Sequence, residues 1–472
     1  MRTACVILAA GQGKRMRSTL PKVLHRVCGM PMLQAVIDTA TRLKPEQVIV
    51  VAGRQIDILM KEITVSDIQF MQQKDPKGTG DALKSALPAL KDFRGTVLVL
   101  NGDTPLIGAQ TIKRFLALHR KNDNAISVLS FHAEDPKGYG RVVRDRSGKF
   151  LAIVEEKDTD NSQKKIHEVN SGVYAIRHDA LSLLGRLAMN RQKGEYYLTD
   201  IISLSLRQGL RTAAFAIGEE TEFMGVNTRE ELLMASQVMR QGIVRNCIAA
   251  GVNFLDPASV YIHPHAVIGR DTTIYPNVFI EAGTKIGSSV TIYPHVRILR
   301  STIDAHAVIK DSTVIEDSHI CIGATVGPFA HIRPGSEVGA YAKIGNFVEL
   351  KKAVIGNGAK ASHLSYLGDA EIGREVNIGA GTITCNYDGQ NKHRTIIGDN
   401  VFVGSDTQFV APVTIGKGAY IGAGSTITKD VLPWSLAVSR TEQRNIKDWA
   451  KNKQAKVKAK NMQAKARRKT GK

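Results

Sequence analysis

A group of glycines and basic residues near the start of the chain is suited to binding phosphate. An apolar run at residues 3–9 leads into the sequence AAGQGKRM at residues 9–16, and Lys22 follows. Glycines placed directly after a strand let backbone N–H groups approach a phosphate, and the charges of Arg15 and Lys22 favour an anion. A dinucleotide fingerprint would need glycine where the chain has Met16, and the sequence contains no Walker A loop. The loop therefore predicts a phosphate-binding site that is neither a dinucleotide-binding loop nor a Walker A loop.

A second candidate for chemistry is His363, in the sequence ASHLSY at residues 361–366. Histidine is the side chain whose ordinary pKa lies near neutrality, which suits a general base. Such a base needs a group that orients its ring, and Glu349, 14 positions earlier, is the candidate. A lone histidine is more often structural or solvated, so the interpretation depends on the elements that hold it.

Those elements are indicated by an aliphatic residue at every sixth position over much of the C-terminal half. The period is kept in separate runs by Ile268, Ile274, Ile280, Ile286, Ile292 and Ile298, by Ile303, Ile309 and Ile315, by Ile320, Val326, Ile332, Val338, Ile344 and Leu350, and by Ile397, Val403, Phe409, Ile415, Ile421 and Ile427. A period of six fits neither an α-helix nor an alternating strand, and is typical of a hexapeptide β-helix. Three hexads form a triangular coil of about 18 residues, and neighbouring coils lie about 4.8 Å apart.

The six-residue period lapses around residues 361–371 and 385–396, and loops on rigid scaffolds often carry function. Hexapeptide β-helices recur in acyltransferases that use acyl-CoA. Acetyl transfer to an amine requires a base, because a protonated amine is not a nucleophile. His363 and the loop at 385–391 therefore predict an acetyltransferase site. Cys385 is not needed as a nucleophile, since direct transfer from CoA uses no protein thiol.

The first half of the chain predicts an α/β domain. Strands are expected at residues 3–9, 47–52, 96–100, 125–131 and 169–176, and helices at 31–43, 79–90 and 109–121. This alternation favours a Rossmann-like, mostly parallel sheet covered on both faces, with ligands beyond the carboxyl ends of its strands. The predicted organisation is an α/β domain at 1–227, an amphipathic linker helix at 228–251, a left-handed parallel β-helix at 252–443 and a basic tail at 444–472.

Composition places the chain among ordinary soluble globular proteins. Its 472 residues are 43% hydrophobic and 23% charged, and allow two or more domains. The five cysteines are far apart and form no CxxC pair, which argues against a disulfide framework or a structural zinc site and favours a reducing compartment. No apolar run has the length of a signal-peptide core or a membrane span. We therefore expect a cytoplasmic protein.

The net charge of +20 is concentrated at the C-terminus. Residues 444–472 contain twelve Lys or Arg and one acid, Asp448. Such a tail is most often disordered and solvated, and we expect its positive charge to attract anionic small molecules or an acidic surface. No aromatic residue follows Trp449 to stack on bases, which argues against a nucleic-acid partner.

The N-terminal loop and Pro21-Lys22 resemble the activating loop of sugar-phosphate nucleotidylyltransferases. Three later segments occur in the family's order, namely Gln73 with Gly78-Thr79-Gly80, Asn101-Gly102-Asp103 and Asn227. The resemblance implies that a sugar 1-phosphate attacks the α-phosphate of a nucleoside triphosphate, with pyrophosphate leaving and Mg²⁺ assisting. It implies Arg15 and Lys22 as catalytic cations, and Asp103 and Asn227 as Mg²⁺ ligands.

The nucleotide and sugar site implied by this resemblance is larger. Its members are Leu8, Ala9, Ala10, Gly11, Lys22, Gln73, Gly78, Thr79, Asn101, Gly102, Asp103, Gly140, Glu155, Asn170 and Asn227. The chain departs from the family pattern at Lys14, where a small hydroxyl residue is usual, and at Asn101, where an aromatic is common. These departures bear on the choice of nucleotide or sugar.

Over essentially its whole length the chain is similar to the bacterial family of bifunctional N-acetylglucosamine-1-phosphate uridylyltransferases and glucosamine-1-phosphate N-acetyltransferases. The resemblance implies His363 as the catalytic base. It implies sugar-phosphate contacts from Arg333, Lys351, Tyr366 and Asn377, and acetyl-CoA contacts from Ala380, Asn386, Tyr387, Ser405, Ala423 and Arg440. The family is a homotrimer that uses glucosamine 1-phosphate, acetyl-CoA, N-acetylglucosamine 1-phosphate and UTP. Its product, UDP-N-acetylglucosamine, serves peptidoglycan and lipopolysaccharide synthesis.

Two other interpretations use the same folds. A nucleotidylyltransferase with a purely structural β-helix would not need Arg333, Lys351, His363 or the 385–391 loop. A regulatory or exchange-factor subunit predicts an eroded activating loop, whereas Gly11, Gly13, Arg15, Lys22 and Asp103 are all present. Both are less consistent with the sequence than the bifunctional enzyme.

Overall fold

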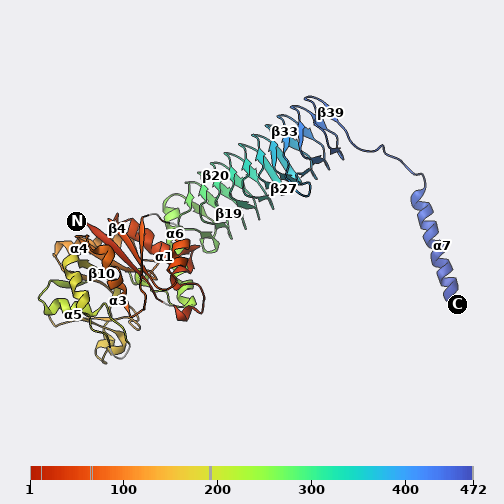
Figure 1. Cartoon of the computed structure of the whole chain (residues 1–472). Helices are drawn as coiled ribbons and strands as arrows, with labels where there is room; N and C mark the ends of the chain where they lie inside the picture. The colour runs from red at the N-terminus through yellow and green to blue at the C-terminus, as the bar shows by residue number, and fades with distance from the viewer. Residues whose placement is uncertain (1, 12, 64, 66, 191–193, 470–472) are drawn as a thin grey trace. The chain divides into compact units, whose positions relative to one another are not determined.

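The computed structural model describes residues 2–11, 13–63, 65, 67–190 and 194–469 (Figure 1). The chain divides into two compact units, Met1–Thr302 and Ile303–Lys472. The first unit holds the α/β domain, the following helix and the first hexads, and the second holds the remaining hexads and the basic tail. The fold class expected from the sequence is confirmed, whereas the domain boundaries drawn from sequence pattern remain a prediction.

The α/β domain is built on a mixed sheet of order β11-β7-β10-β6-β1-β4-β5. Its strands are β1 (Thr3–Ala9), β4 (Gln47–Ala52), β5 (Ile68–Gln72), β6 (Thr96–Asn101), β7 (Ile126–His132), β10 (Glu168–Arg177) and β11 (Thr212–Ala216). Strand β1 runs parallel to β4 and β6, whereas β10 is antiparallel to both β6 and β7. The parallel core places the carboxyl ends of β1, β4 and β6 at one edge, where the candidate site lies.

Both faces of this sheet are covered, as the near-continuous apolar runs predict. Alternate residues of β1 belong to two different hydrophobic clusters, Val6 to one and Ile7 to the other. The first cluster includes Leu83 of α3, and the second includes Leu33 of α1 and Phe115 of α4. The helices of the domain are α1 (Met32–Thr41), α2 (Ile56–Glu62), α3 (Thr79–Ser85), α4 (Ala109–Lys121) and α5 (Asp200–Arg207).

The predicted elements agree with the structure most closely where apolar runs are long. The bounds of β1, β4 and α4 match the expected ranges, whereas the predicted helix at 79–90 divides into α3 and a 3₁₀ turn, Leu87–Leu90. The sequence pattern did not predict α2, α5, β5 or β11, nor the short strands β2 (Arg26–Val27), β3 (Met30–Pro31), β8 (Arg141–Arg144) and β9 (Phe150–Val154).

Helix α6 (Arg229–Ala249) follows the α/β domain. It begins at a capping box, in which Thr228 Oγ1 accepts from the Glu231 N–H at 3.2 Å and the Glu231 carboxylate accepts from the Thr228 N–H at 2.9 Å. The helix was expected to be amphipathic, but only Ala235 and Val244 are buried and Leu233 is 61% exposed. Its apolar face is thus less covered than the sequence pattern predicted.

The hexads of the first unit form short parallel strands. They are β12 (Asn253–Phe254), β13 (Tyr261–Ile262), β14 (Val267–Ile268), β15 (Thr273–Ile274), β16 (Phe279–Ile280), β17 (Lys285–Ile286), β18 (Thr291–Ile292) and β19 (Arg297–Leu299), with β20 (Thr302–Ile303) at the end of the unit. Thr273 pairs with Thr291 and Ile274 with Ile292, 18 positions along, as three hexads per coil require.

The second unit continues the same pattern of parallel strands. They are β21 (Val308–Ile309), β22 (Val314–Glu316), β23 (His319–Ile320), β24 (Thr325–Val326), β25 (His331–Ile332), β26 (Glu337–Val338), β27 (Lys343–Lys351), β28 (Val354–Ile355), β29 (Lys360–Gly368), β30 (Ala370–Ile372), β31 (Asn377–Ile378), β32 (Ile383–Cys385), β33 (Thr395–Ile397), β34 (Phe402–Val403), β35 (Gln408–Val410), β36 (Val413–Ile415), β37 (Tyr420–Ile421), β38 (Thr426–Ile427) and β39 (Leu436–Ala437). The periodic aliphatics point inward, and Ile309, Ile332 and Val403 are fully buried.

Coils of the second unit differ in length, which explains the offsets in the six-residue period. Lys343 pairs with Lys360, so this coil has 17 residues rather than 18. Asn377 pairs with Phe402, 25 positions along, because the loop that contains residues 385–391 is inserted in that coil. The ladder on either side of the loop keeps its register, so the loop is held by a regular scaffold.

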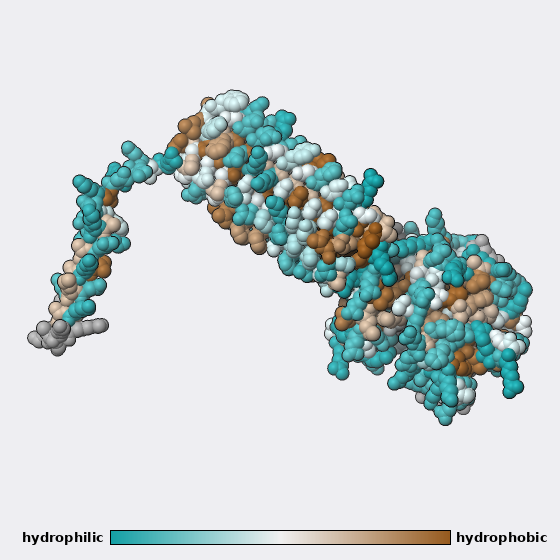
Figure 2. Space-filling view, turned by 180° about the vertical axis from the view of Figure 1, so that it is seen from behind, coloured by the Kyte–Doolittle hydropathy of each residue, from teal (hydrophilic) through white to brown (hydrophobic). Residues whose placement is uncertain are grey.

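The basic tail is helical rather than disordered. Helix α7 (Trp449–Lys469) is formed mainly by Ala, Lys and Gln, which have high helix propensity. Its described side chains are exposed, and Figure 2 shows this helix as mostly hydrophilic. Val457 and Met462 are exposed apolar residues on it. The prediction of disorder is therefore wrong for α7, while the prediction of solvation is confirmed. None of the helices in the described ranges is both long and apolar enough to span a membrane.

Removing a buried aliphatic should cost far more stability than removing an exposed one. Ile332→Ala truncates a fully buried side chain between coils, and we expect it to lower the free energy of unfolding by about 2–5 kcal/mol. Ile322→Ala, at a position that is 40% exposed, is the matched control and should cost much less. Urea unfolding followed by circular dichroism measures both, and equal losses would contradict an inward-facing stack.

Candidate active sites

The first candidate site is a cavity of about 650 Å³ at the carboxyl ends of β1 and β6. Eight of the residues predicted from the sequence line it, namely Leu8, Ala10, Gly11, Gln73, Gly78, Thr79, Asn101 and Asp103. They come from three separate segments of the chain, and the sheet topology brings them to one edge. Lys14 also lines the cavity, so this departure from the family pattern faces the site.

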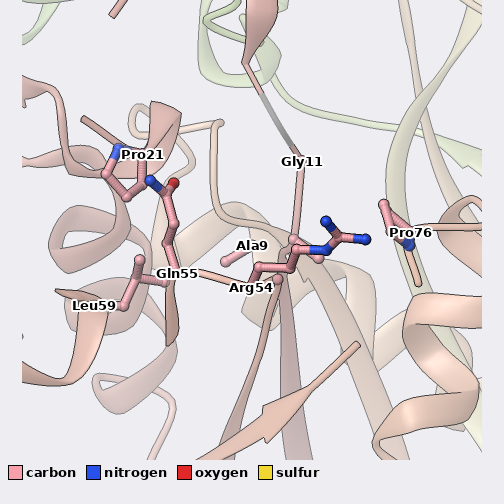
Figure 3. A pocket seen from close by; sticks show the side chains of 9 residues that line it. Ala9, Gly11, Pro21, Arg54, Gln55, Leu59 and Pro76 are labelled. Atoms are coloured by element: carbon pink, nitrogen blue, oxygen red, sulfur yellow. The ribbon is translucent and has the colours of Figure 1, made fainter. Parts of the chain in front are cut away.

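A smaller cavity of about 250 Å³ adjoins the same loop, and Ala10 and Gly11 line both cavities. Figure 3 shows the side chain of Arg54 extending between Gly11 and Pro76. Sequence reasoning did not single out Arg54, because no motif marks it. Its position after β4, the strand beside β1, was the available signal, since both strands end at the same edge.

Lys22 lies at the centre of a polar group beneath the glycine-rich loop. Its Nζ donates to the Asp103 carboxylate and, at 3.0 Å, to Asn227 Oδ1. The side chain is buried, with a residue exposure of 8%. A Cβ added at Gly13, whose φ is 60°, would lie 2.6 Å from Lys22 Cβ, so glycine is required there for the lysine to pack.

Asp103 and Asn227 converge although 124 positions separate them in the sequence. The Val226 N–H donates to Asp103 O at 2.9 Å, which fixes the two segments side by side. A carboxylate and an amide oxygen aimed at one cationic atom are hard ligands of the kind a divalent metal prefers. The residues present therefore fit a divalent cation at the position where Lys22 Nζ now bonds to both.

Arg15 is placed differently from Lys22. It lies on the short 3₁₀ turn Lys14–Met16, is exposed, and lines neither of the two cavities. Lys22 thus belongs to the polar group with Asp103 and Asn227, whereas Arg15 lies apart from the two cavities. The role of Arg15 remains a prediction.

Gln73 and Gly78 shape one wall of the larger cavity. Gln73 is only 3% exposed, and its Nε2 donates to Gly78 O at 3.2 Å and to Asp81 Oδ2 at 2.7 Å. Gly78 has a φ of 95°, and a Cβ there would lie 2.6 Å from Tyr196 O. Glycine is therefore required before α3, and the buried amide of Gln73 fixes the turn.

Gly140, Glu155 and Asn170 also lie together. The Asn170 N–H donates to Gly140 O at 2.9 Å, and a Cβ at Gly140 would approach Glu155 Oε2 to 3.7 Å. Glu155 Oε1 accepts from Thr199 Oγ1 at 2.9 Å. Three residues predicted to hold the sugar therefore form one wall, although none of them lines the described cavity.

The second candidate site lies on the β-helix around His363, which is exposed on β29. Its Nδ1 is 2.8 Å from Asn346 Oδ1, and the two residues are paired in neighbouring coils. The amide oxygen can only accept, so Nδ1 carries the proton and Nε2 is the free basic nitrogen. Glu349, expected to orient the ring, instead accepts from Arg333 Nη1 at 2.6 Å. The orienting contact therefore belongs to Asn346.

Several predicted acetyl-CoA residues form a row along the corner that contains His363. Gly381 N–H donates to Leu364 O at 2.9 Å, Asp406 N–H to Ala380 O at 2.7 Å, and Gly424 N–H to Ser405 O at 2.8 Å. These bonds place His363, Ala380, Ser405 and Ala423 at equivalent positions of successive coils. Arg440 ends the row, since its Nη1 donates to Ala423 O at 2.6 Å.

Cations gather on the face beyond this corner. Arg333 and Lys351 occupy equivalent positions of neighbouring coils, because Arg333 N–H donates to Leu350 O at 2.8 Å. The pKa of Lys351 is lowered, chiefly by its close contact with Lys392 and by the charge of that residue. Two adjacent ammonium groups repel each other unless an anion lies between them, so the group is suited to a phosphate. Lys392 was not predicted, because it lies in the inserted loop outside the six-residue period.

The inserted loop is internally ordered. The Asp388 carboxylate accepts from the N–H groups of Gln390 and Asn391 at 2.8 and 2.6 Å, and from His393 Nε2 at 2.7 Å when that ring is protonated there. These bonds hold the pKa of Asp388 well below its usual range. Asn386 is buried and donates to Asp369, whereas Tyr387 is 61% exposed. The loop therefore presents an aromatic residue from a fixed base.

Comparison with known proteins gives matches to both halves and to the whole chain. The family model of the MobA-like NTP transferase domain matches residues 5–192, and that of the bacterial transferase hexapeptide, as six repeats, matches 265–300 and 394–429. A protein of Thermodesulfovibrio yellowstonii is 50% identical over 449 residues, covering 95% of this chain and 99% of the relative. Proteins of Pelobacter propionicus (46% identical, covering 94% and 97%) and Geobacter sulfurreducens (44%, covering 96% and 99%) are similar over comparable lengths. All three are named bifunctional protein GlmU.

The contact with Asn346 predicts which tautomer of His363 is present. In the neutral ring the proton should lie on Nδ1, and Asn346→Leu should shift the population toward the Nε2–H form, since the acceptor is lost. Nitrogen chemical shifts in NMR distinguish the two tautomers. Glu349→Gln is the matched control and should leave the tautomer unchanged. A change of tautomer in Glu349→Gln but not in Asn346→Leu would show that Glu349 orients the ring.

Proposed function

The chain belongs to the family of bifunctional GlmU proteins, and from this premise we propose which of its residues carry out each of the two reactions. It is a transferase of UDP-N-acetylglucosamine synthesis with two activities. One acetylates the amine of glucosamine 1-phosphate from acetyl-CoA. The other transfers a uridylyl group from UTP to N-acetylglucosamine 1-phosphate and releases pyrophosphate.

Uridylyl transfer takes place in the cavity at the carboxyl ends of β1 and β6. Asp103 and Asn227 would hold Mg²⁺, which would offset the negative charge of the α-phosphate and the leaving pyrophosphate. Lys22 Nζ now donates to the same Asp103 and Asn227 oxygens. If a metal ion took those oxygens, the Lys22 ammonium group would be available to the phosphates. The backbone of the glycine-rich loop and Arg15 supply further positive potential to the leaving group.

Base and sugar are held by two separate groups of residues, one that lines this cavity and one outside its lining. Gln73 and the turn at Gly78 and Thr79 lie on the wall that would contact the uracil, since they combine an amide with close backbone approach. Gly140, Glu155 and Asn170 would hold the sugar hydroxyls, which require mixed donors and acceptors. This arrangement aims the sugar phosphate oxygen at the α-phosphate, and positioning of this kind accounts for much of the catalysis.

Acetyl transfer takes place at the corner of the β-helix, and the carrying observation is the free Nε2 of His363 at the end of the corner row. The amine of glucosamine 1-phosphate attacks the thioester carbonyl, so that a C–N bond forms and the C–S bond breaks. The amine proton passes to His363 Nε2 and from there to the leaving CoA sulfur. Asn346 keeps the ring in the tautomer that can accept this proton.

Acetyl-CoA lies along the corner row. Three coil steps from His363 to Ala423 span about 14 Å, a length that suits an extended pantetheine arm. Small residues at Ala380, Ser405 and Ala423 leave the row open. Arg440 lies at the end of the row and suits the phosphates of CoA. Asn386 and Tyr387 of the inserted loop contact the CoA arm from the side.

The sugar phosphate is bound by Arg333, Lys351, Tyr366 and Asn377, with Lys392 added from the structure. Arg333, Lys351 and Tyr366 lie beyond the corner from His363, since Leu364, with a φ of 43°, turns the chain between His363 and Tyr366, whereas Asn377 pairs with Lys360 before the corner. The parts of one acetyl site are therefore brought together most simply by a second copy of the chain. Exposed Phe329 and Phe347, whose rings stack with centroids 5.4 Å apart, give an apolar surface for such packing.

The assembly that follows is a homotrimer, in which each acetyl site is completed by a neighbouring copy. The enzyme works in the cytoplasm, where UTP and acetyl-CoA are available. Its product feeds peptidoglycan synthesis and, in bacteria that contain it, lipopolysaccharide synthesis. Size-exclusion chromatography with light scattering tests the trimer, and a stable monomer with full acetyltransferase activity would contradict it.

Replacing His363 should separate the two activities. His363→Ala removes the base, and we expect the acetyl step to slow about 10²–10⁴-fold while uridylyl transfer is unchanged. Release of free CoA and of pyrophosphate, assayed separately on the same preparation, measures both. His306→Ala removes another exposed histidine of the β-helix and should affect neither step. An equal loss of both activities in His363→Ala would indicate misfolding rather than loss of a base.

Replacing Asp103 should have the opposite effect. Asp103→Ala removes a carboxylate from the metal position, so Mg²⁺-dependent pyrophosphate release should be abolished and CoA release retained. Isothermal titration should show weaker Mg²⁺ binding in the same variant, while Asp92→Ala, at an exposed carboxylate, should match the parent protein. Retained uridylyl transfer in Asp103→Ala would rule out its role as a ligand.

A further inference from the structure

One face of the β-helix carries a group of sulfur, nitrogen and oxygen ligands that neither reaction uses. Strand β23 ends at the buried Ile320, which His319 precedes and Cys321 follows, and residues i and i+2 of an extended chain point to the same side. Both side chains therefore point outward. Asp304 follows the buried Ile303 in the same way that Cys321 follows Ile320.

The ladder places an acid next to each of these two residues. Asp304 N–H donates to Ile320 O at 2.8 Å, which sets Asp304 beside Cys321 in the neighbouring coil. His319 pairs with Glu337 in the next coil. Four side chains from three successive coils thus meet on one surface, held by backbone bonds rather than by a flexible loop.

The distances suit a metal ion. The ligand atoms of Asp304, His319 and Cys321 all lie within 4.8 Å of one another. His319 Nε2 is 3.0 Å from Asp304 Oδ2, and Cys321 Sγ is 3.9 Å from Glu337 Oε1. With bonds of about 2.0–2.3 Å, ligands of a tetrahedral zinc ion are roughly 3.3–3.8 Å apart, so small side-chain rotations suffice.

We propose that this face binds one zinc ion. Its ligands are Asp304, His319, Cys321 and Glu337. One thiolate, one imidazole and two carboxylates match the borderline-soft preference of Zn²⁺, whereas Mg²⁺ takes oxygen ligands alone. The ion links three coils, and its role is structural because four protein ligands leave no open position for a substrate.

The two carboxylates place negative charge beside Cys321. Partial burial, followed by the charges of Glu337 and Asp304, raises the pKa of the Cys321 thiol. A divalent cation between the two carboxylates and the sulfur removes this repulsion and stabilises the thiolate. The side chains of Asp304 and His319 are 39% and 43% exposed, so an ion can enter from solvent.

Cobalt is the probe that reports the sulfur ligand directly, because a Cys–Co²⁺ bond gives a charge-transfer absorption. Full-length protein is titrated with Co²⁺ in excess Mg²⁺, which keeps the oxygen site at Asp103 engaged. We expect one equivalent with a thiolate band, its loss in Cys321→Ser, and at least about tenfold weaker binding in His319→Ala. Cys247→Ser and His331→Ala remove a thiol and a carboxylate-paired histidine elsewhere, and should retain the band.

Zinc itself provides the second readout. Zn²⁺ should raise the Tm of the parent protein but not that of Cys321→Ser or Asp304→Asn, because only a ligand bound to the folded state stabilises it. Circular dichroism of the variants without metal checks that they are folded. Absence of a thiolate band in the parent protein, or an undiminished rise in Tm in Cys321→Ser, overturns the assignment.

Discussion

Each edge of a β-helix coil has one inward-pointing aliphatic side chain, which only the neighbouring coils can shield from water. The rest of the second unit depends on this constraint. Stacking fixes every outward position in a column with a spacing of about 4.8 Å. Chemistry on such a surface is therefore arranged in rows. The row from His363 to Ala423 and the group around Cys321 are both products of the same ladder, since each gathers side chains from successive coils.

The α/β domain brings its functional side chains together in a different way. Its polar group is assembled from the ends of parallel strands and from the segment before α6, so Lys22, Asp103 and Asn227 meet from distant parts of the sequence. Glycine at position 13 is required because any side chain would displace the buried Lys22. One chain thus carries a site built at a sheet edge and a site built along a prism corner, which fits two separate reactions.

The sequence predicted the fold, and it named eight of the residues that line the first cavity, because both rest on patterns that are local or periodic. The prediction failed where a distance along the sequence had to be translated into neighbouring positions on successive coils. Glu349 lies 14 positions before His363, which is less than one coil, whereas Asn346 lies 17 before it and is its true neighbour. Lys392 was missed because it lies outside the period. The cysteine spacing argued against a zinc site because that argument considers neighbours along the chain, whereas Cys321 meets Asp304 and Glu337 across coils.

The proposed acetyl site has the thioester of acetyl-CoA at His363 and the rest of the cofactor along the corner row. A crystal structure of the full-length protein with CoA would show where the cofactor binds. We expect the CoA sulfur within hydrogen-bonding reach of His363 Nε2, the pantetheine arm along Ala380, Ser405 and Ala423, and a phosphate at Arg440. CoA bound on another face, or with its sulfur remote from His363, would contradict this placement.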